Sequence, residues 1–311
     1  MANNSFLYLF VRRFLIAIPT LLCLLTIAFF MMRITPGGPF DTEKDLPPII
    51  QENLNKIYHL DEPLYQQYFR YLGQLLQGDF GPSFQYKDFT VNELIYAGFP
   101  ISLRLGLSAI FLAIVVGSII GAFAALKQNS RYDYALMTFA MTGISIPNFV
   151  MAPVLILIFA IGLQWLPAGS WNNGAFNHTM LPIISLALPQ IAYVSRIMRG
   201  SMIEVLNSPY IRTAKAKGLP FRHILFKHAF KPAFIPILSY LGPATAGVIT
   251  GSVVIEQIFG IPGLGRYFVQ GALNRDYTLV MGVVVFYGTL IIMFNFLVDV
   301  LYRVFDPRIK S

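Results

Sequence analysis

Residues 208–236 read SPYIRTAKAKGLPFRHILFKHAFKPAFIP, and every charged side chain in this stretch is a lysine or an arginine. The 311-residue chain as a whole is apolar: 56% of its residues are hydrophobic and only 12% are charged, with a mean hydropathy of +0.61. Soluble domains carry about a quarter charged residues, so this composition predicts a membrane protein with several spans. A long basic stretch inside such a chain needs a physical explanation.

Apolar runs along the chain predict six transmembrane helices, at residues 14–32, 103–126, 134–163, 181–194, 234–255 and 279–304. A helix needs about 20 residues to cross the hydrocarbon core, so the fourth run requires its flanking residues. The first run follows Arg12 and Arg13 as in a signal peptide, but it is too long and no small-residue cleavage site follows before Pro36. We therefore expect an all-α polytopic membrane protein with a retained anchor helix over 1–33, a periplasmic insert over 34–100 and a five-helix core over 101–311.

The distribution of charge predicts the orientation of these spans. With the N-terminus placed inside, 15 of the 23 Lys and Arg residues fall on the inner side, but only four of the 15 acids do. The positive-inside rule then places both termini and residues 208–236 in the cytoplasm. The formal net charge of +8 reflects this asymmetry, and no nucleic-acid partner is expected.

Stop signals within 208–236 predict a short, rigid helix. Ser208 can accept a bond from a free backbone N–H, and Pro209 suits the first helical position. Gly218 can take the left-handed conformation that ends a helix, and Pro220 prevents its continuation. A rigid helix of two turns between spans can transmit force to those spans if a partner protein binds it. The alternative is a plain basic loop that obeys the positive-inside rule and binds anionic lipid.

The insert between the first two spans opens with a turn at residues 36–39 and then predicts an amphipathic helix. Asp61 can cap this helix, Pro63 fits its first turn and Gly78 stops it, while apolar residues recur between them at helical spacing. The apolar face must lie on the membrane surface, on the outer mouth of the bundle or on a partner protein. A packing role is favoured over a binding role.

A second outer segment joins the last two spans. Its glycines and proline predict a tight turn, followed by a short helix over 267–273; the turn residues are Gly260, Pro262, Gly263 and Gly265. A charge at a membrane boundary is costly and usually paired, so we expect Glu256 to pair with Arg266 or Arg275, with a substrate contact as the alternative.

Small residues within the spans predict close helix contacts. Gly117 and Gly121 form one G-x-x-x-G pattern, and Gly247 and Gly251 form another. Ordinary membrane packing explains these patterns as well as a bundle that rocks.

Motifs for catalysis and metal binding are missing from the sequence. It contains no G-x-x-x-x-G-K-[ST], H-E-x-x-H, G-x-S-x-G or C-x-x-C pattern, and its one cysteine, Cys23, lies inside an apolar run. His223 and His228 are five residues apart, which predicts different helix faces rather than a shared metal. We therefore expect no catalytic residue and no metal site. Carboxylates are scarce deep in the spans, which disfavours a self-powered secondary carrier.

Residues 212–236 resemble the EAA loop of bacterial ABC-importer permeases. Ala214 and Gly218 match that pattern, while Arg212 and Thr213 stand where Glu and Ala are commoner, as is usual in the peptide-transporter branch. GDFGPSF at 78–84 and E-x-x-x-G-x-P-G-x-G at 256–265 agree, whereas Thr278 stands where many members have Pro. The resemblance covers essentially the whole chain and is closest to the oligopeptide permeases, with dipeptide permeases next.

The resemblance implies a type I ABC-importer permease fold in a bacterial inner membrane. An EAA-type coupling loop at about 200–232 would dock in a groove of an ATPase subunit through Tyr210, Arg212, Thr213, Ala214, Lys215, Lys217 and Gly218. The implied partners are a second, homologous permease subunit forming a heterodimer, two ABC ATPases that hold ATP and Mg²⁺, a periplasmic peptide-binding protein and the peptide. Glu256, Gly263, Gly265 and Asp276 are candidates for a periplasmic gate or a binding-protein contact. The residues that bind substrate are not identified by the sequence.

Three alternatives stay open at this point. A related importer for dipeptides, glutathione or nickel shares much of the pattern. A stand-alone secondary carrier would need its own ion site. A membrane scaffold or an enzyme without transport would not need the rigid basic helix within 208–236.

Overall fold

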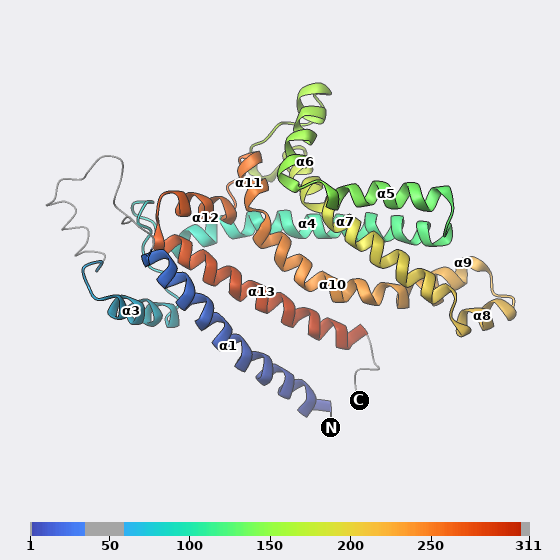
Figure 1. Cartoon of the computed structure of the whole chain (residues 1–311), viewed down its shortest axis with the longest axis horizontal. Helices are drawn as coiled ribbons and strands as arrows, with labels where there is room; N and C mark the ends of the chain where they lie inside the picture. The colour runs from blue at the N-terminus through green and yellow to red at the C-terminus, as the bar shows by residue number, and fades with distance from the viewer. Residues whose placement is uncertain (1, 35–58, 306–311) are drawn as a thin grey trace. The chain divides into compact units, whose positions relative to one another are not determined.

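The computed structural model describes residues 2–34 and 59–305, and these residues fold into helices joined by short connections (Figure 1). The predicted turn at 36–39, residues 35–58 of the insert and the last six residues lie outside the described part. The helices are α1 (Ala2–Ile34), α3 (Leu64–Leu76), α4 (Val91–Leu126), α5 (Arg131–Ser145), α6 (Asn148–Leu155), η1 (Ile156–Gly162), η2 (Asn172–Gly174), α7 (Phe176–Leu206), α8 (Pro209–Ala216), α9 (Phe221–His223), η3 (Ile224–Ala229), α10 (Phe230–Gly251), α11 (Val253–Phe259), α12 (Leu264–Leu273) and α13 (Tyr277–Phe305).

Within the described residues, five helical segments are long and apolar enough to span a membrane: Leu15–Ile34, Val91–Leu126, Phe176–Leu206, Phe221–Gly251 and Tyr277–Val298. The predicted third span is bent by 107° between α5 and the continuous α6–η1 segment, and it makes a sixth if the two halves cross together. The bend falls at Ile146 because the proline that follows disfavours helical backbone there. The fourth span gains the flanks it needed, since α7 is 31 residues long.

The chain divides into two compact units. Unit 1 comprises residues 1–101 and 262–290, and unit 2 comprises residues 102–261 and 291–311. Unit 1 holds α1, α3, α12 and the beginnings of α4 and α13. Unit 2 holds the rest of α4, the elements from α5 to α11 and the rest of α13. Each unit is described by itself below.

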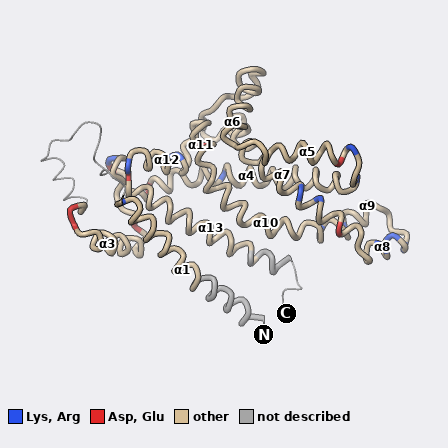
Figure 2. The backbone as a smooth tube through the Cα atoms, viewed as in Figure 1, with Lys and Arg blue, Asp and Glu red and all other residues tan. Residues whose placement is uncertain are grey.

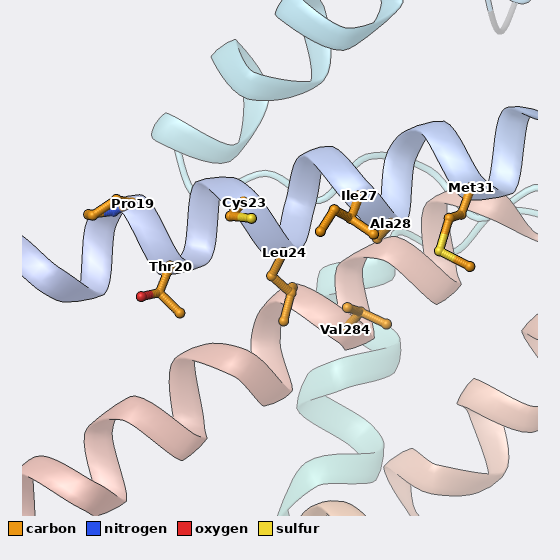
Figure 3. A pocket seen from close by; sticks show the side chains of 8 residues that line it. All are labelled: Pro19, Thr20, Cys23, Leu24, Ile27, Ala28, Met31 and Val284. Carbon is orange, nitrogen blue, oxygen red and sulfur yellow. The ribbon is translucent and has the colours of Figure 1, made fainter.

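In unit 1, α3 packs its apolar face against α1 and the start of α13. Tyr71 is buried with Leu25, Phe29 and Met281, and the Tyr68 hydroxyl lies 2.7 Å from Thr26 Oγ1. The opposite flank of α1 forms an apolar groove of about 750 Å³ with α13, lined by Pro19, Thr20, Cys23, Leu24, Ile27, Ala28, Met31 and Val284 (Figure 3).

The start of α3 differs from the prediction. Pro63 has an extended backbone (ψ 142°) and precedes the first helical residue, and no side chain caps the helix. The expectation that Asp61 caps it, with Pro63 in its first turn, is therefore wrong. Backbone bonds close the first turn instead, since the carbonyl of Pro63 accepts from the N–H of Gln66 at 2.9 Å and from that of Gln67 at 3.2 Å. The predicted stop is confirmed: Gly78 has φ +77° and its N–H bonds to the carbonyl of Leu75.

In unit 2, the first G-x-x-x-G pattern brings α4 against α7. A Cβ added at Gly117 would lie 2.8 Å from Val194 Cβ, and one at Gly121 would lie 2.4 Å from the carbonyl oxygen of Ser195. Only glycine allows this approach. The second pattern behaves differently, because among the described residues a Cβ at Gly247 or Gly251 would meet no atom within 4 Å apart from the neighbouring backbone of its own helix.

The predicted outer turn between the last spans is shorter than expected. Gly260 is left-handed (φ +65°) and ends α11, and Gly263 is extended just before α12. Gly265 lies inside α12 and not in the turn, because this helix begins at Leu264, three residues before the predicted start. In unit 1, Gly98 of α4 makes room for that start: a Cβ there would lie 2.8 Å from the Leu264 nitrogen.

Candidate functional site

The basic stretch folds as the short helix α8, and its two ends are formed differently. Pro209 stands in its first turn, as predicted. Ser208 does not cap the helix: its hydroxyl donates to the carbonyl of Val205 at 2.6 Å and so completes the end of α7 instead. The prediction of a Ser208 cap was therefore wrong, because the preceding helix competes for the same hydroxyl.

The C-terminal end of α8 is a Schellman motif. Gly218 is left-handed (φ +74°), its N–H bonds to the carbonyl of Lys215 at 3.0 Å, and the N–H of Leu219 bonds to the carbonyl of Ala214 at 3.3 Å. Both bonds satisfy carbonyls that a helix end leaves free. Lys215 lies in the last turn, where a cation favours the helix dipole.

The inner face of α8 is rooted in a hydrophobic core of unit 2. Ile211 is fully buried and Ala214 is 8% exposed, and they pack with Met202 of α7, Ile224 of η3 and Ala233 of α10. α8 is therefore anchored in a hydrophobic core that α7, η3 and α10 also form. Ala214, which the family pattern singles out, faces this core and not the solvent.

The outer face of α8 is bare. Tyr210, Arg212, Thr213, Lys215 and Lys217 are all exposed, and Tyr210 shows 47% of its surface. Figure 2 shows the basic residues of α8 and α9 at one end of unit 2, the end that also carries the turn from α4 to α5. The helix and its C-cap residue thus expose three cations and the Tyr210 ring on a rigid base, a surface that could bind in the groove of another protein.

The two histidines that follow α8 correct one prediction. η3 is a π-helical turn, whose hydrogen bonds join residues five apart. It therefore brings His223 and His228 together, with ring centroids 5.5 Å apart, and not onto different faces. No group of three or more potential metal ligands occurs among the described residues.

An ion pair that the sequence did not reveal braces α5 against α7. Arg199 Nε lies 2.6 Å from Asp133 Oδ1, and Arg199 Nη2 lies 2.7 Å from Oδ2. Asp133 is 1% exposed and also accepts from the backbone N–H of Asn129 at 2.9 Å. Ser130, three residues before Asp133, accepts from its N–H and caps α5. This S-x-x-D spacing is a capping signal that could have marked Asp133 as a structural acid.

In unit 1, Asp276 joins the GDFGPSF loop to the start of α13. Its Oδ2 accepts from Ser83 Oγ at 2.5 Å and from the backbone N–H of Phe84 at 3.1 Å. Its Oδ1 accepts from the N–H of Leu279 at 3.0 Å, which is an N-cap of α13. Asp276 is fully buried. The hydroxyl of Thr278, where many members of the resembling family have Pro, donates to the carbonyl oxygen of Pro82 at 2.6 Å. This bond joins the same two segments.

The other outer candidates are also buried. Glu256 of α11 is fully buried in unit 2, where its Oε1 accepts from Ser102 Oγ and Ser252 Oγ, both at 2.6 Å. Two hydroxyl donors stabilise a carboxylate in a poorly solvated place. Gly263 and Gly265 of unit 1 are buried as well. Pairing of Glu256 with Arg266 or Arg275 stays a prediction.

Comparison with known proteins agrees with these features. Residues 117–311 match the family described as "Binding-protein-dependent transport system inner membrane component". The chain is 58% identical over 299 residues to the oligopeptide transport system permease protein OppB of Salmonella typhimurium, covering 96% of this chain and 98% of that protein. It is 45% identical over 301 residues to the dipeptide transport system permease protein DppB of Bacillus subtilis, covering 96% and 97%.

Solved structures show the same fold at low sequence identity. A chain of the inward-facing MetNI methionine ABC transporter has a TM-score of 0.59 at 16% identity and covers 69% of this chain and 97% of that one. A chain of an amino acid ABC transporter has a TM-score of 0.51 at 21% identity and covers 68% and 94%. The fold is therefore the type I importer permease fold, and the chain belongs to the oligopeptide family of ABC-importer permeases, the inner-membrane components of binding-protein-dependent transport systems.

Proposed function

We propose that this chain is the permease subunit of an ATP-driven oligopeptide importer and forms half of the translocation pathway. The observation that carries the proposal is the 58% identity to an oligopeptide permease over 96% of the chain, against 45% to a dipeptide permease. The bundle of spans with a rigid basic helix on one end supports it.

The coupling step is assigned to α8. The core contacts of Ile211 and Ala214 hold the helix on α7, η3 and α10, and its exposed face is left for an ATPase groove. When two ATPases close on ATP, each pushes on such a helix. A displacement of α8 is passed to the spans because the helix has little freedom of its own. ATP and Mg²⁺ would be held by the ATPases and not by this chain.

A second permease subunit is proposed to complete the pathway. Gly247 and Gly251 of α10 face open space in the described part of the chain, which leaves room for a helix of the partner to approach closely. The basic bias of the inner segments supports an orientation with both termini in the cytoplasm of a bacterial inner membrane.

On the outer side, a peptide-binding protein is proposed to dock on the insert and on the segment around α12. Asp276, Glu256, Gly263 and Gly265 are buried, so we assign them to the gate that docking moves and not to the docking surface itself. The hydrogen bonds of Asp276 to Ser83 and of Glu256 to Ser102 and Ser252 would then change as the gate changes state.

Charge reversal on α8 tests the coupling role. The double variant Arg212→Glu/Lys215→Glu should lose co-purification of the ATPases and uptake of a labelled tetrapeptide in cells that lack the native permease. Arg222→Glu is the matched control, because Arg222 is exposed in the same basic loop but lies on α9. Unchanged uptake and association in the double variant would exclude α8 as the coupling element.

Two further uptake measurements distinguish this proposal from the alternatives. Uptake that persists when the ATPases are absent would indicate a secondary carrier. Uptake of a dipeptide, glutathione or nickel, but not of the tetrapeptide, would identify a related importer.

A further inference from the structure

A small cavity of about 240 Å³, with a lining that is about half polar and half apolar, lies in unit 1 between the end of α1, α3 and the start of α13. Its lining includes Arg33, Gln67, Arg70, Tyr71, Gln74 and Tyr277. Four of these residues belong to the outer insert on which a binding protein is proposed to dock, but no role in transport has been assigned to any individual residue of this lining. The cavity has the liquid volume of about eight water molecules, which is enough for a phosphate ester and too little for an oligopeptide.

Three buried polar atoms on the cavity's lining residues have no hydrogen-bond partner in the described part of the chain: Arg33 Nε, Gln67 Oε1 and Tyr71 OH. The Gln67 and Tyr71 residues are only 7% and 6% exposed. Buried polar groups are nearly always satisfied, because an unpaired one destabilises the fold. The set has a cation, a hydroxyl and a carbonyl oxygen. It therefore fits a ligand that offers an anionic acceptor at one end and a hydrogen-bond donor nearby.

The charge at the cavity is positive and held in place. The Arg33 guanidinium lies 5.4 Å from the centre of the Phe29 ring and 5.3 Å from that of Tyr277, so two aromatic rings fix its position. Arg70 already has an acidic partner, since its hydrogen bond to Glu62 lowers the pKa of that carboxyl. A planar guanidinium held in this way suits bidentate binding of a phosphate.

The cavity lies where phospholipid headgroups are expected. Arg33 stands in the last turn of the span Leu15–Ile34. α3 buries Tyr71 but leaves Tyr65, Phe69 and Leu76 exposed by 61%, 66% and 89%. A helix with bare aromatic and apolar side chains beside the end of a span is typical of the membrane interface. Phosphates are the abundant anions at that depth.

We propose that this cavity binds the headgroup of a phospholipid, with its phosphate on Arg33 and Tyr71 and a headgroup hydroxyl or ammonium on Gln67 Oε1. The acyl chains lie along the exposed apolar side chains of α1 near Arg33, which are Phe30 and Ile34. The bound lipid ties α3 to the end of α1.

Native mass spectrometry of the detergent-solubilised importer complex tests this site. After delipidation, the complex is titrated with dioleoylphosphatidylglycerol. Arg33→Gln should weaken the tightest lipid adduct by about tenfold or more, since a hydrogen bond to a charged group is lost. Tyr71→Phe keeps the ring and the packing, and should weaken the adduct by about fivefold. Lys87→Gln is the matched control, because Lys87 is an exposed cation of the same unit, and its adduct should equal the wild type.

Competition identifies the source of the phosphate. The lipid should stay bound in a millimolar excess of inorganic phosphate, because the acyl chains contribute to its affinity. Displacement by phosphate would overturn the lipid assignment in favour of a free-anion site, and displacement by a tetrapeptide would overturn it in favour of a substrate site. Equal adducts in wild type, Arg33→Gln and Tyr71→Phe would refute the site altogether. The readout is independent of uptake, so its failure leaves the transport proposal standing.

Discussion

Replacing Asp276 by alanine should release the GDFGPSF loop from the start of α13. The carboxylate caps α13 through Leu279, and loss of such a cap costs about 1 kcal/mol. It also accepts from Ser83 Oγ and from the N–H of Phe84, and each bond to a charged group contributes at least about 1.5 kcal/mol. The local opening free energy should therefore fall by about 4 kcal/mol. Each 1.4 kcal/mol is a factor of ten, so amide exchange in residues 80–90 should accelerate by at least about 100-fold.

Hydrogen exchange with mass spectrometry on the purified complex measures this change directly. Asp61→Ala is the matched control: Asp61 is exposed in the same unit, and α3 has no side-chain cap to lose. Acceleration below about threefold in Asp276→Ala would refute the account of Asp276 as a structural clasp. Lost uptake with unchanged exchange would instead favour a direct role at the gate.

Three further substitutions have clear outcomes. Gly121→Ala places a Cβ 2.4 Å from a carbonyl oxygen of α7 and should lower the yield of folded protein. Gly200→Ala, with open space around it, should instead stabilise the protein by about 0.5–1 kcal/mol. Thermal unfolding in detergent compares the two variants. Asp133→Asn should destabilise the protein by about 3 kcal/mol because it leaves Arg199 without its charged partner. If the swap Asp133→Arg/Arg199→Asp restores no stability, that result would argue against the pair. Ala214→Leu should overpack the core beneath α8 by about 1–3 kcal/mol and lower the melting temperature, and an unchanged value would show that α8 is not rooted there.

Local chemistry explains what could be predicted about α8. Pro209 at the first turn and Gly218 at the end act through their own backbones, so their effect does not depend on the rest of the fold. Ser208 has a hydroxyl that can bond to either of two helices. The choice between α7 and α8 was settled by geometry that the sequence does not contain.

Periodicity arguments failed where the helix itself was irregular. The spacing of His223 and His228 was interpreted with 3.6 residues per turn, but η3 is π-helical and reverses the conclusion. The bend at Ile146 was partly predictable, since a proline follows it. Its angle of 107° depends on what α5 and α6 pack against.

The sequence by itself determined that this chain spans a membrane several times, and it placed a stiff basic helix between two of the spans. The span lengths, Pro209 in the first turn of α8 and Gly218 at its end are local features, and the residues that carry each of them stand close together in the sequence. Only the tertiary structure decided which side of α8 is free, because burial of Ile211 and Ala214 requires three other helices. It alone brought Asp276 to Ser83 across 193 residues and Arg199 to Asp133 across 66, since no spacing rule joins residues that only folding makes neighbours. The cavity at Arg33, Gln67 and Tyr71 has the same origin, because it lies between helices and belongs to no single segment.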